Sequence, residues 1–195
     1  MSPKILVISG SRRTQSLNTR LARLGASAIE RAGGTPTLLD IDRYPLPLYD
    51  GDVEQSGGLP PAALELKSQF NAHHGFLVVS PEYNASIAPL LKNLIDWVSR
   101  PTPSEEGRVP YKDKVAAMAS VTPSPHAGIR GLMHLRQVLS SLGTWVVPNQ
   151  YTLGAAREAF AEDGTLRNPA HLGGLEALCT ELVAAAAKTG RTNGC

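Results

Sequence analysis

The sequence predicts an α/β domain in which helices cover both faces of a parallel β-sheet. Two patterns predict this fold. Short apolar runs are continuous instead of alternating, which is typical of strands buried on both faces. Segments of helical period separate these runs, and strands that alternate with helices form parallel sheets through crossover connections. The 195 residues correspond to one domain, since about 150 residues is a usual domain length.

Each element is expected from its own stretch of sequence. Four apolar runs predict strands, and a weaker fifth run follows them; they lie at 5–8, 37–41, 76–79, 115–118 and 144–147. Apolar stripes predict helices over 17–28, 60–72, 87–98, 132–142 and 172–186. Residues 43–58 and 100–113 are rich in Pro and Gly and are expected to be irregular. We expect residues 1–188 to form the domain and 189–195 to be a flexible tail.

The composition excludes several classes of protein. The 19 basic and 17 acidic residues give a net charge of +2, so a general nucleic-acid surface is not indicated. Two cysteines exclude a disulfide framework, and no Cys or His spacing resembles a metal site. No stretch approaches the roughly 18 apolar residues of a membrane span. The first apolar run is too short for a signal peptide, so we expect a cytoplasmic protein without nucleic-acid or membrane partners.

The loop after the first strand carries the strongest functional signal. It reads Gly10-Ser-Arg-Arg-Thr-Gln-Ser-Leu-Asn18, and a helix begins within it. Free N–H groups at a helix N-terminus favour an anion, hydroxyl groups add donors, and Arg12 or Arg13 supplies a guanidinium. Ser16 is also a favoured N-cap residue, so capping alone is an alternative. Capping does not account for two arginines beside several hydroxyl groups, and a phosphate site is favoured.

The loop lacks the motifs of the common nucleotide sites. The chain contains no G-x-x-x-x-G-K-[ST], and its first turn does not read G-x-G-x-x-G. These absences disfavour ATP-type phosphoryl transfer and a typical dinucleotide site. A donor-rich loop of this kind favours the flavodoxin-like branch of doubly wound folds, with strand order 2-1-3-4-5 and FMN between strands 1 and 3.

The loop after the third strand supplies a second group of polar residues. It reads Ser80-Pro-Glu-Tyr-Asn-Ala-Ser86. Tyr83 offers an aromatic group beside a ring system, and Ser86 is placed to cap the next helix. A turn that only redirects the chain is the alternative. Two polar loops after strands 1 and 3 favour a shared site.

These two segments resemble the signature segments of the NADPH-dependent FMN reductase family, which includes quinone, chromate and azo-dye reductases. The resemblance lies in S-x-R-x-x-S-x-N after the first strand, and in P-E-Y-N-x-S with L-K-N-x-I-D-W on the following helix. It implies that the FMN phosphate is held by Ser11, Arg13, Ser16 and Asn18; Leu17, between them, is also expected to bind the cofactor. It implies that the flavin ring is lined by Pro81, Glu82, Tyr83, Asn84 and Ser86. The loop from Ser120 to Gly131 departs from the glycine-rich turn of the family, and Ser120 completes the expected cofactor-binding set.

The resemblance implies an NAD(P)H-dependent oxidoreductase. NADPH or NADH is the co-substrate, and hydride passes through flavin N5 to an acceptor such as a quinone, a free flavin, an azo compound or a metal oxyanion. The cofactor carries the chemistry, so we expect no catalytic side chain and no metal. A flavodoxin-type electron carrier without NAD(P)H turnover is an alternative, although such carriers are expected to be acidic. A phosphate loop that holds a non-flavin ligand is another.

The helix over 87–98 has a second, polar face. Lys92, Asn93, Asp96 and Trp97 alternate with its apolar stripe. The resemblance implies a homodimer or homotetramer built on this face. An ordinary solvent-facing surface with one exposed tryptophan is the alternative.

Overall fold

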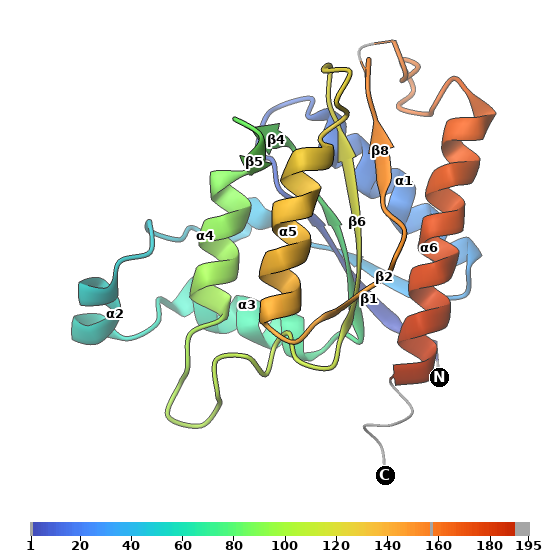
Figure 1. The fold of residues 1–195 in the computed structure, drawn as a ribbon. Helices are drawn as coiled ribbons and strands as arrows, with labels where there is room; N and C mark the ends of the chain where they lie inside the picture. Colours follow the sequence, from blue (N-terminus) through green and yellow to red (C-terminus); the bar gives the residue numbers. More distant parts are fainter. Residues whose placement is uncertain (1, 157, 190–195) are drawn as a thin grey trace.

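The computed structural model describes residues 2–156 and 158–189. Residues 190–195, most of the expected tail, lie outside this part. The sheet is sandwiched between two layers of helices (Figure 1). One face packs against α1 (Leu17–Arg31) and α6 (Pro169–Thr189). The other face packs against α3 (Pro61–Asn71), α4 (Pro89–Val98) and α5 (Ile129–Ser141).

The central strands alternate their side chains between these two layers. In β1 (Lys4–Ser9), Ile5 and Val7 belong to the core beneath α1 and α6, whereas Leu6 and Ile8 belong to the opposite core. All four are buried. This double burial explains why the strand appears in the sequence as a continuous apolar run.

The expected strand order is confirmed. The parallel sheet runs β2 (Thr35–Leu38), β1, β3 (Gly75–Val79), β6 (Val115–Val121) and β7 (Trp145–Val146). The fifth position is shared by two short strands, because β7 pairs with the start of β6 while β8 (Tyr151–Leu153) pairs with its end. Pro148 lies between them and has no N–H to donate to a ladder.

Two expected boundaries were wrong. The second strand was expected at 37–41 but occupies 35–38, and the 3₁₀ helix η1 (Ile41–Arg43) follows it, with Asp40 as N-cap. The helix expected from 87 begins at Pro89, because Ser86–Ile87 form β5, which pairs with β4 (Glu82–Tyr83) in an antiparallel hairpin.

The segment 43–58 is less irregular than expected and covers the tryptophan of α4. It contains α2 (Gly51–Gly57), which has no buried residue and lies away from the sheet (Figure 1). The Trp97 Nε1–H donates to the Pro47 carbonyl at 2.8 Å, and the Tyr49 ring packs edge-on against Trp97. Trp97 is 0% exposed. The interpretation of an exposed tryptophan is therefore wrong, because the chain's own segment covers it.

Within residues 2–156 and 158–189, no helix is long and apolar enough to span a bilayer. The same residues contain no cluster of His, Cys, Asp and Glu suited to a metal ion.

Candidate functional site

A cavity of about 310 Å³ lies at the carboxyl ends of β1, β3 and β6. The loops that follow these three strands form its walls. Most of the residues predicted from the sequence meet there; the lining consists of Ser11, Arg13, Gln15, Ser16, Leu17, Asn18, Pro81, Glu82, Tyr83, Val121, Thr122 and Pro123. The crevice at the carboxyl edge of an open α/β sheet is the usual ligand site of such folds.

The β1–α1 loop has unused N–H donors, and two of the residues that carry them, Ser11 and Gln15, line this cavity. The backbone N–H groups of Ser11, Arg12, Thr14 and Gln15 donate no hydrogen bond within the described part of the chain. Gln15 has a φ of +59°, and alternation between right- and left-handed residues turns successive N–H groups toward one point, which forms an anion-binding concavity. The loop therefore fits a phosphate group.

Ser16 serves the helix and the cavity together. Its Oγ accepts a hydrogen bond from the Thr19 N–H at 3.3 Å, so it is the N-cap of α1. The same residue lines the cavity, and its O–H proton is not used by the cap. The capping alternative and the anion site are thus compatible.

The two arginines of the loop have different environments. Arg12 Nε pairs with Asp42 Oδ1 at 2.9 Å, and its guanidinium also donates to the Ile41 carbonyl. The guanidinium of Arg13 has no partner among the described residues and lines the cavity. Arg13 is therefore the arginine available to an anion there.

Asn18 connects the first loop to the end of β6. Its Nδ2–H donates to the Val121 carbonyl at 3.0 Å, and its Oδ1 accepts from the Val121 N–H at 3.2 Å. Both ends of the buried amide are used. Asn18 therefore lines the cavity and holds two of its walls together; its expected contact with the phosphate stays a prediction.

The β4–β5 hairpin forms the opposite wall. Tyr83 lines the cavity and is 45% exposed. Asn84 and Ala85 form the tip, with φ of +51° and +61°. Ser86 Oγ is hydrogen-bonded to His134 Nδ1 of α5. Asn84 and Ser86 are therefore not among the lining residues, which differs from the expectation.

Glu82 directs its carboxylate away from the cavity and toward α5. Its Oε1 accepts from Arg130, at 3.1 Å from Nε, and its Oε2 accepts from the Gly131 N–H at 3.0 Å. Burial of the carboxyl acts to raise the pKa of Glu82, but the hydrogen bonds from Arg130 and Gly131 outweigh it and hold this pKa below its usual value. Glu82 is thus an ionised anchor of the hairpin.

The loop after β6 contributes differently from what the sequence predicted. Ser120 is fully buried, and its Oγ has no hydrogen-bond partner in the described part of the chain. It lies beneath Gly128, where an added Cβ would come within 2.0 Å of that oxygen. Ser120 is not a lining residue; Thr122 and Pro123 form this wall instead. Their position just after the strand was the only signal in the sequence that could have identified them.

The cavity is lined by hydrogen-bond donors and by the aromatic side chain of Tyr83. No His or Cys is among its lining residues, and Glu82 is engaged with α5. Cys179 lies elsewhere, buried between α6 and α1, where burial raises the pKa of its thiol to about 12. The arrangement can bind and orient a phosphate-bearing ring, and such a ring would have to carry the reactivity itself.

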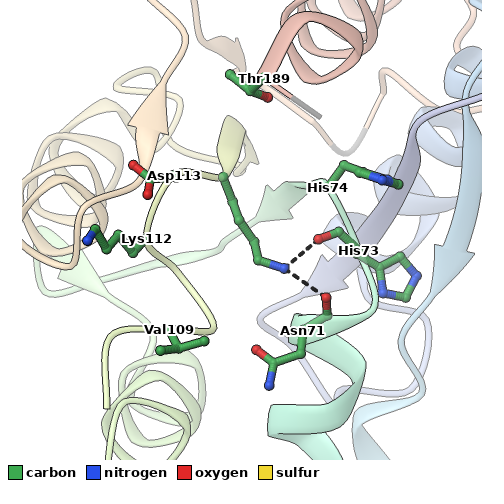
Figure 2. Close-up of a pocket in the computed structure, with 8 residues that line it drawn as sticks. Asn71, His73, His74, Val109, Lys112, Asp113 and Thr189 are labelled. Carbon is green, nitrogen blue, oxygen red and sulfur yellow. Dashed lines mark hydrogen bonds between the residues drawn. The ribbon is translucent and has the colours of Figure 1, made fainter. Parts of the chain in front are cut away.

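A separate hollow, of about 490 Å³, lies far from this cavity, at the amino-terminal ends of the strands (Figure 2). Lys114 lines it and donates to the carbonyls of Phe70, Asn71 and His73 at the end of α3. Burial lowers the pKa of Lys114 to about 8. Because its ammonium holds the end of a helix, we assign this residue a structural role.

Proteins of similar sequence and similar structure are known. The sequence matches the profile of the NADPH-dependent FMN reductase family over residues 3–158. An NAD(P)H-dependent FMN reductase of Pseudomonas aeruginosa is 36% identical over 84% of each chain. The probable NADPH:quinone oxidoreductase 2 of rice is 38% identical over 70% of this chain, which spans 66% of the rice protein. The flavoenzyme NAD(P)H:(acceptor) oxidoreductase FerB of Paracoccus denitrificans has a similar structure, with a TM-score of 0.80 and 28% identity over 95% of this chain and 98% of FerB.

Proposed function

This chain belongs to the NADPH-dependent FMN reductase family, and from that premise we propose how its residues serve an FMN-dependent oxidoreductase that uses NAD(P)H. The resemblance, the flavodoxin-like fold and the cofactor expected from the sequence are confirmed. The relatives are named reductases and oxidoreductases, and nothing favours the electron-carrier alternative.

One observation carries the assignment of the site. A single cavity joins unused N–H donors and the unpaired Arg13 at one wall to Tyr83 at the other. We assign the phosphate of FMN to Ser11, Arg13, Ser16 and the N–H groups of the β1–α1 loop. We assign the ring to the wall formed by Pro81, Tyr83, Thr122 and Pro123.

FMN, when bound, supplies the capacity to accept a hydride and to pass electrons on. The residues of the chain bind and orient it. Asn18 and Glu82 hold the walls in place through Val121 and Arg130, respectively. The lining includes no His or Cys, and its carboxylate, Glu82, is paired with Arg130; that the reaction needs no acid or base from the protein stays a prediction.

The acceptor is proposed to be a small molecule. A quinone is the first candidate, because the rice relative is named a quinone oxidoreductase; free flavins, azo compounds and metal oxyanions are further candidates. The cytoplasmic location and the homodimeric or homotetrameric state stay predictions.

The test is the spectrum of the purified protein, followed by anaerobic addition of NADPH. A flavin absorbance that bleaches with NADPH is expected, and a colourless protein that does not take up added FMN would contradict the function.

Replacing the unpaired arginine tests the assignment of the phosphate. Arg13→Ala should weaken the binding of FMN by about 1.5–3 kcal/mol, the range for hydrogen bonds to charged groups. This loss corresponds to a roughly 10- to 150-fold rise in the Kd of FMN. Riboflavin, which lacks the phosphate, should bind the variant and the wild type alike. Arg108→Ala, at an exposed residue of the segment 100–113, is the control and should leave both affinities unchanged. If riboflavin binds the wild type as tightly as FMN, the assignment is wrong.

A further inference from the structure

We propose that a second cavity, between α1 and the carboxyl end of β2, receives the 2′-phosphate of NADPH, and that Arg20 and Arg23 select NADPH over NADH. This inference rests on the proposed function. It concerns residues outside the FMN cavity.

The second cavity adjoins the first across the β1–α1 loop. Its volume is about 610 Å³, and it shares Ser11, Arg13, Gln15 and Ser16 with the FMN cavity. One of its walls is α1, which contributes Arg20 and Arg23, and the other is the segment from Leu38 to Asp42. The two cavities therefore lie on either side of the loop assigned to the FMN phosphate.

The acidic side chains of this cavity are already engaged. Asp40 Oδ1 accepts a hydrogen bond from the Asp42 N–H as the cap of η1. Asp42 Oδ1 pairs with Arg12 Nε at 2.9 Å. Neither carboxylate is within ion-pair distance of Arg20 or Arg23. Neither of these carboxylates therefore forms an ion pair with the two arginines.

Arg20 and Arg23 have no hydrogen bond or ion pair from their guanidinium groups within the described part of the chain. They are three residues apart on α1 and therefore lie on one face of the helix. Arg20 is half-buried. On their other side they border a smaller hollow with Glu162 and Asp163, which also form no ion pair with them. Two neighbouring guanidinium groups without partners fit a doubly charged oxyanion, which arginine binds through paired hydrogen bonds.

The identity of the oxyanion follows from the length of the co-substrate. The nicotinamide must reach the ring cavity near Tyr83, but NADPH carries a second nucleotide and has to extend beyond that cavity. A path along the β1–α1 loop leads its adenosine end to the α1–β2 cavity. In dinucleotide-binding α/β folds, the adenosine ribose lies at the end of the second strand, and an arginine nearby accommodates the 2′-phosphate. The cavity offers arginines at the equivalent corner, although the chain lacks the glycine pattern of those folds.

The first test measures binding without turnover. Adenosine 2′,5′-bisphosphate and 5′-AMP, the adenosine halves of NADPH and NADH, are titrated into the FMN-loaded protein by calorimetry. The bisphosphate should bind about tenfold or more tightly than 5′-AMP, as expected for charge-assisted hydrogen bonds. An Arg20→Gln, Arg23→Gln double variant should lose this difference. Arg31→Gln, in the last turn of α1 where Arg31 forms only an exposed ion pair with Glu176, is the matched control and should keep it.

The second test separates the two co-substrates kinetically. In the double variant, KM for NADPH should rise about tenfold or more while KM for NADH and both kcat values change less than twofold. Equal affinity of the wild type for the two adenosine nucleotides would overturn the proposal. So would inorganic phosphate that displaces the bisphosphate at equal concentration, since the cavity would then be a general anion site. If neither NADPH nor NADH reduces the bound FMN, the proposed function fails, and the calorimetry still decides the inference.

Discussion

At the scale of single residues, the tip of the β4–β5 hairpin combines two left-handed residues. Asparagine adopts positive φ readily, but an alanine there costs roughly 1–2 kcal/mol because its Cβ approaches the following carbonyl. Ala85 has a φ of +61° directly after Asn84. The strain lies two residues from Tyr83, at the wall assigned to the flavin ring, which is where strained backbone is often found.

Glycine at this tip should relieve the strain. We expect Ala85→Gly to raise the free energy of unfolding of the FMN-free protein by about 0.5–1 kcal/mol, the steric gain less the entropic cost of glycine. Urea unfolding measures it. Ala26→Gly in the interior of α1 is the control and should lower stability by about 0.5–1 kcal/mol, the helix penalty of glycine. A loss of unfolding free energy of similar size in Ala85→Gly would show that Ala85 is not strained.

Residue roles could be predicted only where local sequence decides them. The N-cap role of Ser16 depends only on Thr19, three residues along the chain, and could therefore be predicted from the sequence. Arg12 and Arg13 are identical neighbours, and what separates them is Asp42, about 30 residues along the chain. Asn18 and Ser120 were expected to contact the cofactor, yet their surroundings come from β6 and from the Gly128 turn. Such long-range contacts leave no local pattern.

At the scale of elements, the hairpin is fixed to the first turns of α5. Glu82 bonds to Arg130 and Gly131, and Ser86 bonds to His134. The absence of a side chain at Gly131 permits the close approach, because an added Cβ would lie 3.0 Å from the Ser86 carbonyl oxygen. The position of the ring wall therefore depends on α5, a helix outside the cavity lining.

Removing the arginine of this anchor should destabilise the protein in a pH-dependent way. The pKa of Glu82 is lowered in the folded state, so the stabilisation is present above its unfolded value near 4.5 and is lost as the pH falls through the folded value. Arg130→Met should lower the free energy of unfolding at pH 7 by about 0.2–1 kcal/mol, the range of an ion pair with a solvent-exposed partner, and this loss should shrink in acid. Denaturant unfolding at a series of pH values measures both.

Arg136→Met is the matched control for this pH dependence. Arg136 also lies on α5, but it donates only to the backbone carbonyls of residues 146–148. The loss of unfolding free energy in Arg136→Met should stay constant over the same pH range. An Arg130→Met deficit that is equally constant would show that Glu82 does not contribute through its charge.

The main strands and helices could be predicted because burial on two faces and a 3.6-residue period are properties of the local sequence. The hairpin could not. Ile87 continues the apolar stripe of α4, although Pro89 starts the helix and β5 comes before it. The divided fifth strand likewise depends on which part of β6 each piece reaches.

At the scale of the whole molecule, the cavity exists because the chain leaves β1 and β3 toward opposite layers. The loop after β1 leads to α1 on one face of the sheet, and the loop after β3 leads to α4 on the other (Figure 1). Divergence of neighbouring loops opens a crevice at the strand ends. The order of elements predicted a doubly wound fold, and the donor-rich loop after β1 favoured the branch with this crevice between strands 1 and 3.

Assembly is the prediction at this scale. The resemblance to the family implies a homodimer or homotetramer, and Leu48, Trp145 and Met133, which are 82%, 66% and 62% exposed, are apolar side chains that an assembly could cover. Sedimentation at micromolar concentration should give a dimer or a larger species. A stable monomer that oxidises NADPH at the full rate would contradict both the assembly and a role for a second subunit in the site.

The buried thiol has a consequence for an enzyme that handles quinones. Quinones are electrophiles that add to thiolates, and a thiol reacts only to the extent that it is ionised. Cys179 is the cysteine within the described part of the chain. It lies between α1 and α6, and burial raises the pKa of its thiol to about 12. At neutral pH it is almost entirely neutral and is covered by two helices. The fold therefore protects this side chain from arylation by the quinones proposed as acceptors of the enzyme.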